Sequence, residues 1–340
     1  MSAASLSILS AGPGATIQDG GRHGYLRYGI TAAGPMDPLA HATANRALDN
    51  EAGATAIEIS LGGIELTAEG GPVGVALAGG DMRLSLDGAP LPPAVAVTLE
   101  PGAALRVRAG RSGAWTYLAV AGRLDVAPML GSTATHTRSG FGGLEGRALR
   151  PGDRLRVADP RPGPAEPHAL LAPWLDRPPE RIRVVLGPQD DFFAEDQVAA
   201  FLSGPWTVTP RGDRMACFLD GTPLRHARGY NIVSDGIAMG AIQVPGEGRP
   251  IVLMADRQST GGYPKIATVI GPDLGRLAQA QAGTRIGFRA VTLAQAVAAR
   301  RAEAEALRPA VAREPLRRTE FTAEFLLGRN LIGGVVDAGA

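Results

Sequence analysis

The feature that most constrains the fold is a succession of short apolar runs separated by turn residues. Examples are VGVALAGG (73–80), ALRVRAG (104–110), WTYLAVAG (115–122), RIRVVLG (181–187) and IVLMAD (251–256). Runs of four to eight apolar residues bounded by Gly, Pro or Asp are typical of β-strands, and many such runs favour barrels or sandwiches. The chain also has 46 Gly and 27 Pro, which suit frequent turns. We therefore predict a mainly β fold.

An internal repeat divides the chain in two. LDGAPL (86–91) returns as LDGTPL (219–224), YLAVAG parallels IVLMAD, and RPGDRLRV (150–157) parallels QAGTRIGF (281–288), all at spacings of 131 to 134 residues. Three segments in one order at one spacing indicate two related β units. We predict a first domain over 1–160, a Pro-rich linker over 161–180 and a second domain over 181–291.

Helical periodicity is confined to three segments. It covers 37–50, 273–281 and 292–312, the last of which is rich in Ala and other good helix formers. Residues 292–340 are therefore expected to be a helical extension. Its apolar end, FLLGRNLIGGVVDAGA (325–340), is expected to dock on the body of the protein or on another chain.

Composition excludes several classes of function. The formal net charge of the 340 residues is +1, so no broad basic surface is available for nucleic acid or anionic membrane. Cys217 is the only cysteine, which rules out an internal disulfide and favours a small buried residue over a nucleophile. The sequence lacks a signal peptide pattern and an apolar stretch of membrane-spanning length, and we expect a cytoplasmic protein.

Common catalytic motifs are missing. The residues before the sole lysine, Lys265, read QSTGGYP, so the nucleotide-binding P-loop pattern fails, and no GxGxxG stands between a strand and a helix. The five histidines lack the spacing of zinc hydrolases. No GxSxG elbow is present, although a Ser/His/Asp triad stays open. We expect no metal site.

One polar, glycine-rich segment is TIQDGGRHGYLRYGITAAGPMDP (16–38). Glycine permits positive φ and close backbone approach, so the segment could bring side chains and amides against a small ligand. The alternative is a set of turns before a helix that Asp37 caps. The candidate substrate-binding residues here are Gln18, Asp19, Arg22, Met36 and Asp37.

A second polar group runs from RGDRM (211–215) to ADRQSTGGYPK (255–265). Donors and acceptors of such variety suit a substrate with carboxylate and amide groups, and a sequence that writes its other cations as Arg keeps one Lys here. An ion-paired turn network is the alternative. The candidate catalytic residues are Asp213, Arg214, Asp256, Arg257 and Lys265, and the candidate substrate-binding residues are Gln243, Gln258, Thr260, Gly261, Gly262 and Tyr263.

These segments resemble one known family. TIQDGGRHGY, AGPMDPLAHATANRALDN, AIEISLGG, GDRMACFLDG, LLGRNLIGGVVDA and above all residues 234–269 look like the biotin-dependent carboxyltransferase family. That family includes allophanate hydrolase subunit 2, the carboxyltransferase part of urea carboxylase, the antagonist of a histidine-kinase inhibitor and the C subunit of bacterial 5-oxoprolinase. The resemblance spans residues 8–335.

The resemblance implies a fold, partners and an activity. The fold would be two tandem cyclophilin-like β-barrels with the helical extension. The partners would be the B subunit of 5-oxoprolinase, which is of the allophanate hydrolase subunit 1 type, and the A subunit. The favoured activity is ATP-dependent opening of 5-oxo-L-proline to L-glutamate by the assembled complex, with the ATP site undefined. The chain has no biotin-carrier signature, and Lys265 lacks a flanking MKM, so we expect no biotin attached to it.

Two other functions stay open. One is carboxyl transfer from carboxybiotin, carried by another chain, to a urea-like amide. The other is non-enzymatic binding of a histidine-kinase inhibitor. For the enzymatic functions we expect Arg214, Arg257 and Lys265 to stabilise an oxyanion or carboxylate, Asp213 and Asp256 to orient groups or transfer protons, and Gln18, Gln243 and Gln258 to recognise the amide.

Overall fold

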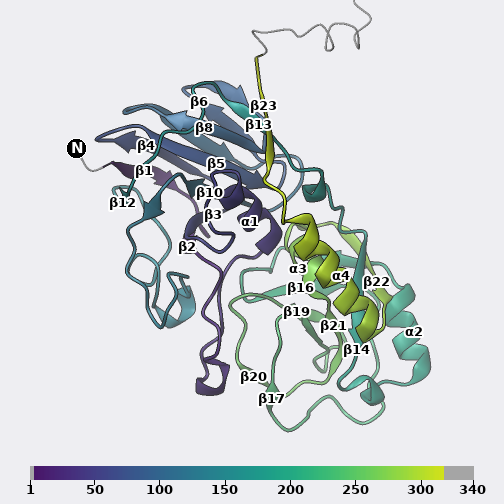
Figure 1. The fold of residues 1–340 in the computed structure, drawn as a ribbon. Helices are drawn as coiled ribbons and strands as arrows, with labels where there is room; N and C mark the ends of the chain where they lie inside the picture. Colours follow the sequence, from purple (N-terminus) through teal and green to yellow (C-terminus); the bar gives the residue numbers. More distant parts are fainter. Residues whose placement is uncertain (1–3, 318–340) are drawn as a thin grey trace, which may run out of the picture.

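The computed structural model describes residues 4–317. It has an N-terminal half of two seven-stranded sheets and a C-terminal half built around a closed seven-stranded barrel (Figure 1). The predicted mainly β fold is confirmed. The predicted docking of residues 325–340 lies outside the described residues.

The N-terminal sheets and the barrel are composed as follows. The first sheet has the order β11 (Arg123–Leu124), β12 (Arg154–Ala158), β1 (Ser5–Ala11), β4 (Ile64–Glu69), β9 (Ala104–Arg108), β6 (Arg83–Leu86) and β7 (Ala89–Leu91). The second sheet has the order β2 (Thr16–Gln18), β3 (Ala56–Ser60), β10 (Trp115–Val120), β5 (Val73–Gly79), β8 (Val95–Leu99), β13 (His168–Leu171) and β23 (Ala312–Pro315). The barrel has the order β14 (Arg181–Leu186), β21 (Lys265–Val269), β18 (Ala241–Gln243), β19 (Ile251–Leu253), β16 (Ala216–Asp220), β15 (Trp206–Val208) and β22 (Arg285–Ala290).

The remaining elements are short. A separate two-stranded antiparallel sheet pairs β17 (Asp235–Gly236) with β20 (Thr260–Gly261). The helices are α1 (Pro38–Arg46), α2 (Glu195–Ser203), α3 (Gly271–Ala278) and α4 (Leu293–Ala306), and the 3-10 turns are η1 (Leu26–Tyr28), η2 (Thr137–Ser139), η3 (Pro173–Leu175) and η4 (Asp190–Phe192). None of the helices described is both long enough and apolar enough to cross a membrane.

All three helical segments predicted from the sequence form helices, with shorter bounds. The predicted capping role of Asp37 is confirmed, because its carboxylate accepts a hydrogen bond from Ala40 N at the start of α1. Thr292 and Gln295 form a capping box at the start of α4. Helix α2 lies outside the three predicted segments.

The segment 161–180 contains more structure than its proline content suggests. Strand β13 lies within it and pairs with β8 on one side and with β23 on the other. The last described strand of the chain therefore completes a sheet of the N-terminal half (Figure 1). The domain boundaries given above stay a prediction.

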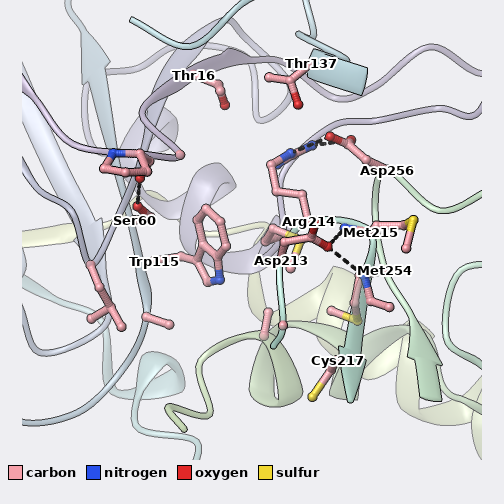
Figure 2. Close-up of a pocket in the computed structure, with 18 of the residues that line it drawn as sticks. Thr16, Ser60, Trp115, Thr137, Asp213, Arg214, Met215, Cys217, Met254 and Asp256 are labelled. Atoms are coloured by element: carbon pink, nitrogen blue, oxygen red, sulfur yellow. Dashed lines mark hydrogen bonds and ion pairs between the residues drawn. The ribbon is translucent and has the colours of Figure 1, made fainter. Parts of the chain in front are cut away.

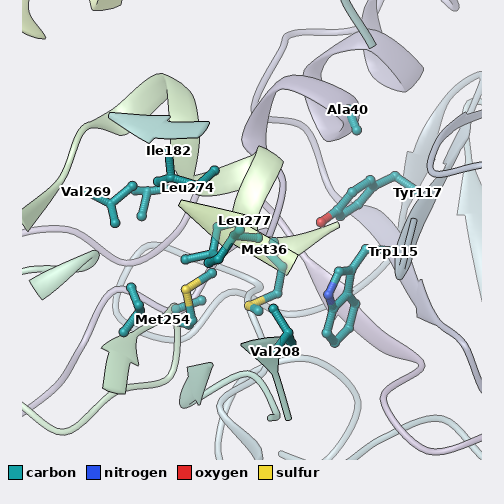
Figure 3. Close-up of a cluster of buried hydrophobic side chains, with 14 of the residues drawn as sticks. Met36, Ala40, Trp115, Tyr117, Ile182, Val208, Met254, Val269, Leu274 and Leu277 are labelled. Carbon is teal, nitrogen blue, oxygen red and sulfur yellow. The ribbon is translucent and has the colours of Figure 1, made fainter. Parts of the chain in front are cut away.

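Alternating side chains on the second sheet bury both of its faces. Val73, Val75 and Leu77 of β5 join a core shared with the first sheet. Ala76 and Ala78 point the other way and join a core shared with α1 and the barrel. Figure 3 shows this second core, with Met36, Trp115 and Tyr117 facing Val208, Met254 and Leu277. The two halves thus share one continuous apolar contact.

Candidate active site

A cavity of about 670 Å³ lies where the two halves meet. Thr16, Ser60, Trp115 and Thr137 line it from the N-terminal half, and Arg214, Cys217, Met254 and Asp256 line it from the barrel half (Figure 2). Much of its wall is apolar, with few polar groups, as in many small-molecule sites. Met36 and Asp213, two further candidates from the sequence, also line it.

Arg214 is the charged centre of this cavity wall. Its Nε and Nη2 donate to the two carboxylate oxygens of Asp256 at 2.9 and 2.8 Å, which is a bidentate pair. Nη1 forms an ion pair with Glu58 of β3, and Nη2 also donates to the carbonyl oxygen of Gly34 at 2.8 Å. Arg214 is only 6% exposed, so its head group is fixed by partners from both halves.

Glu58 extends this network into the N-terminal half. Its Oε2 accepts hydrogen bonds from Met36 N and from the Tyr117 hydroxyl, each at 2.8 Å. The Tyr117 oxygen in turn accepts from Asp37 N at 2.7 Å. Every one of these groups is buried, so each hydrogen bond is made in a setting where an unpaired group would be costly.

The charges in the network do not balance. One guanidinium faces two buried carboxylates, those of Glu58 and Asp256. Burial lowers the pKa of Arg214, but the two carboxylates more than offset this, so its pKa is raised above the usual range. Burial raises the pKa of Glu58 against the opposing effects of Arg214 and its hydrogen bonds. The Tyr117 pKa is raised by burial and by Glu58 and Asp37. Arg214 in the cavity wall thus stays a cation, and the pKa of its buried partner Glu58 is raised.

The sole lysine lies in a second polar cluster, away from the cavity. Lys265 is 2% exposed, and its Nζ lies 3.1 Å from Oδ2 of Asp235 in strand β17. Gln243 is its cross-strand neighbour on β18. Gln258 and Gly261 lie beside Gln243, as an added Cβ on Gly261 would come within 3.1 Å of both amide nitrogens. The structure therefore brings four predicted residues together here.

The polar residues of segment 16–38 are mostly engaged in local structure. Asp19 accepts from Gly21 N, Ser132 Oγ and Thr133 N, and Gln18 donates to Thr16 and to the Thr135 carbonyl. Arg22, 1% exposed, donates to the carbonyls of residues 129, 132 and 134 and stacks on Phe141. Within residues 4–317, the lining of the cavity includes none of these three side chains, and their binding roles stay predictions.

The other candidates are spread between the two clusters. Asp37 binds Arg177 and Gln279 at the joint between the halves. Asp213 folds back on the amides of Met215 and Ala216, and its other oxygen lies 3.4 Å from Arg138. Arg257 donates to the carbonyl of Ile237, and burial lowers its pKa. Thr260, Gly262 and Tyr263 lie in or next to strand β20 of the two-stranded sheet.

Sequence reasoning missed Glu58, Tyr117 and Trp115. Glu58 carried a signal, because a lone acid at the centre of the apolar strand AIEIS must find a partner if the strand is buried. Tyr117 and Trp115 resemble ordinary core aromatics in WTYLAVAG, and nothing in their spacing separates them from packing residues.

Cys217 lines the cavity, but its thiol is poorly suited to attack. Burial raises its pKa to about 12, which leaves very little thiolate at neutral pH. Across residues 4–317, no three His, Cys, Asp or Glu side chains are grouped so as to hold a metal ion. The ion pair of Arg214 with Asp256 lines the cavity, and Glu58 holds Arg214 from the other half.

Comparison with known proteins identifies the family. The model for "Carboxyltransferase domain, subdomain A and B" matches residues 28–290. The chain belongs to this family. The C subunit of 5-oxoprolinase from Escherichia coli is 38% identical over 87% of this chain and 94% of that protein. A protein of the same name from Haemophilus influenzae is 36% identical over equal shares.

Larger fungal proteins contain the same domain. A putative urea carboxylase from Emericella nidulans is 29% identical over 87% of this carboxyltransferase-family chain, which spans only 25% of the fungal protein. The crystal structure of Kluyveromyces lactis urea carboxylase matches with a TM-score of 0.83 and 26% identity, over 91% of this chain and 29% of that one. These matches confirm the predicted family and agree with the mainly β fold.

Proposed function

We propose that the chain is the C subunit of a 5-oxoprolinase, which opens 5-oxo-L-proline to L-glutamate together with the A and B subunits. The observation that carries this proposal is the similarity to two bacterial C subunits, at 38% and 36% identity over 94% of each. The fungal relatives are more distant, at 29% and 31% identity, and match over a quarter or less of their length. The bacterial proteins are therefore the better guide to the activity.

The chemistry needs an energy source and a positive environment. A lactam is a stable amide, so we propose that the complex transfers a phosphoryl group from ATP to the amide oxygen. Water then adds to the carbon of the phosphorylated amide, and the C–N bond breaks as a proton goes to the nitrogen. A second water molecule releases the phosphoryl group as inorganic phosphate. Arg214 would supply fixed positive charge beside the oxygen that becomes negative. No biotin on this chain is required.

The test is a reconstitution. The chain is co-expressed with candidate A and B subunits, and ATP-dependent release of glutamate from 5-oxo-L-proline is measured with and without it. We expect activity only in the complete mixture. Equal glutamate release without this chain would refute the assignment, as would none in a complete mixture of folded, associated proteins.

One observation favours a second function. The cavity lies in a fold that superposes on the Kluyveromyces lactis urea carboxylase over 91% of this chain. Carboxyl transfer from a biotin carried on another chain to an amide would use a similar cation-lined cavity. ¹⁴C-bicarbonate incorporation into urea, assayed with a biotin carboxylase and its carrier protein, distinguishes this function from lactam opening.

A further inference from the structure

The cluster around Lys265 contains a buried hydrogen-bond donor that has no acceptor. Lys265 and Gln243 are paired across β21 and β18 and are 2% and 3% exposed. The amide nitrogen of Gln243 is buried without a hydrogen-bond partner. A buried amide left in this way costs free energy, and native proteins place such groups where something else can accept the bond.

Gly261 packs closely against these donors, and only a residue without a side chain fits there. A Cβ at this position would lie 2.6 Å from Nε2 of Gln243 and 3.1 Å from Nε2 of Gln258, so any larger residue would displace both amides. The amide nitrogens of Gln243 and Gln258 therefore lie close together, beside the δ-methyl group of Ile237. Such an arrangement suits an oxygen-bearing anion.

One carboxylate already approaches this cluster. Asp235 Oδ2 lies 3.1 Å from Lys265 Nζ, and the Asp235 side chain is 55% exposed. Asp235 and Gly236 are held by a single two-residue ladder to Thr260 and Gly261. The acid thus lies on the short, exposed strand β17, whereas its cation is fixed inside the barrel wall.

We propose that Lys265, Gln243 and Gln258 form a binding site for the carboxylate of a small ligand, and that Asp235 holds this place until the ligand arrives. The ligand carboxylate replaces that of Asp235 on the ammonium, and the free amide of Gln243 gains an acceptor. The proposal rests on the proposed function for the identity of the ligand, a cyclic amide bearing a carboxylate. Gln258 is two residues from Asp256, which lines the cavity at Arg214.

The experiment measures binding to the full chain by calorimetry, without turnover. Three probes distinguish the two chemical groups of the ligand. 5-Oxo-L-proline has both a carboxylate and a lactam, tetrahydrofuran-2-carboxylate has only the carboxylate, and 2-pyrrolidinone has only the lactam. We expect 5-oxo-L-proline and tetrahydrofuran-2-carboxylate to bind, and we expect no binding of 2-pyrrolidinone. Asp235→Asn should tighten carboxylate binding by about three- to tenfold, because it removes a competing anion.

Two variants sharpen the result. Lys265→Met should abolish carboxylate binding, and thermal unfolding of the same sample shows whether the variant is folded. Asp220→Asn is the matched control, since Asp220 is a similarly exposed acid paired with Arg249 on the same barrel, and its loss should leave binding unchanged.

The outcomes separate this site from the proposed function. Unchanged or weaker carboxylate binding in Asp235→Asn would overturn the proposal, as would equal binding of 2-pyrrolidinone or no binding to any variant. If both carboxylates bind with the expected Asp235 dependence while the reconstituted complex opens no lactam, the site stands and the 5-oxoprolinase assignment fails.

Discussion

Arg214 shows how much one residue can determine. It joins Asp256 of its own half to Glu58 of the other half, and all three side chains are buried. Removing a partner from a buried ion pair costs far more than the pair itself contributes, because a charge is left without compensation. Removing Arg214 would leave both Glu58 and Asp256 without their cation.

Arg214→Met should therefore lower the free energy of unfolding by about 3–5 kcal/mol. Urea denaturation followed by fluorescence measures the change. The matched control is Arg106→Met, because Arg106 makes a bidentate pair with Glu65 in an exposed position and should cost below about 1 kcal/mol. Equal losses in both variants would contradict the role given to the buried network.

His41, on the buried face of α1, gives a prediction about pH. Burial lowers its pKa to about 4 from 6.5. Between these values the unfolded chain binds a proton that the folded chain does not, so stability falls as the pH drops from 6.5 to 4. The contribution is about 1.4 kcal/mol per pH unit.

His41→Phe should flatten the dependence of unfolding free energy on pH in this window, since Phe keeps the edge contact with Tyr117 and cannot bind a proton. Urea denaturation at several pH values from 4 to 7 measures the slope. The exposed His23 gives the control variant His23→Phe. If the unfolding free energy of His41→Phe changes with pH as steeply as that of the unmodified chain, another group causes the acid sensitivity.

The residues that sequence could and could not predict differ in a physical way. Arg214, Asp256 and Lys265 are charged residues beside glycine-rich turns, which distinguishes them from packing residues, and the structure places each of these three buried side chains in an ion pair. The sequence could not predict that these residues separate into two clusters. That separation depends on the pairing of strands that lie far apart in the sequence. Glu58 was missed for the same reason, since its partner is 156 residues away.

Among the elements, β5 and β10 explain how the halves approach closely. Each strand puts large aliphatic residues toward the first sheet, whereas β5 presents Ala76 and Ala78 toward α1 and the barrel. Alanine on this face allows the helix to lie near the sheet backbone, and α1 does pack on both strands.

Ala78→Leu should overpack this contact and lower the free energy of unfolding by about 1–3 kcal/mol. Chemical denaturation measures the loss, and activity of the reconstituted complex should fall with it if the cavity between the halves is distorted. Ala89→Leu on the exposed strand β7 is the control and should be nearly neutral. A neutral Ala78→Leu would mean that the helix can move away at little cost.

The internal repeat predicted the strands but not their partners. LDGAPL lies on β6 and β7 and LDGTPL begins on β16, while the other repeated pairs fall on β10 with β19 and on β12 with β22. Yet β16 pairs with β19, whereas β6 and β10 belong to different sheets. The local sequence pattern predicts where strands form. Which strands pair depends on the packing of the whole molecule, and no short segment of sequence shows this.

At the scale of the whole molecule, the two halves are connected in an unusual order. Strand β23 follows the barrel in sequence but pairs with β13 of the N-terminal half in the register His168 to Pro315. Arg313 adds a hydrogen bond to the carbonyl of Ala47 at the end of α1. The end of the described chain is therefore part of the first half.

Ala312→Pro should loosen β23 from β13, because proline removes a donor and fits poorly in a paired strand. Hydrogen exchange at the β13 amides that face β23 should become about five- to tenfold faster. Ala310→Pro, just before the strand, is the control. Unchanged exchange in Ala312→Pro would show that β13 needs no cover from β23.

The pairing of β13 with β23 also has a consequence for biosynthesis. A ribosome that has just made Leu171 must add the whole barrel before Ala312 appears, which takes about 7–28 seconds at typical bacterial speeds. During that interval the nascent N-terminal half presents β13 as an uncovered edge, which another strand can pair with. A chaperone that shields this edge should raise the yield of native protein, and slow translation should lower it.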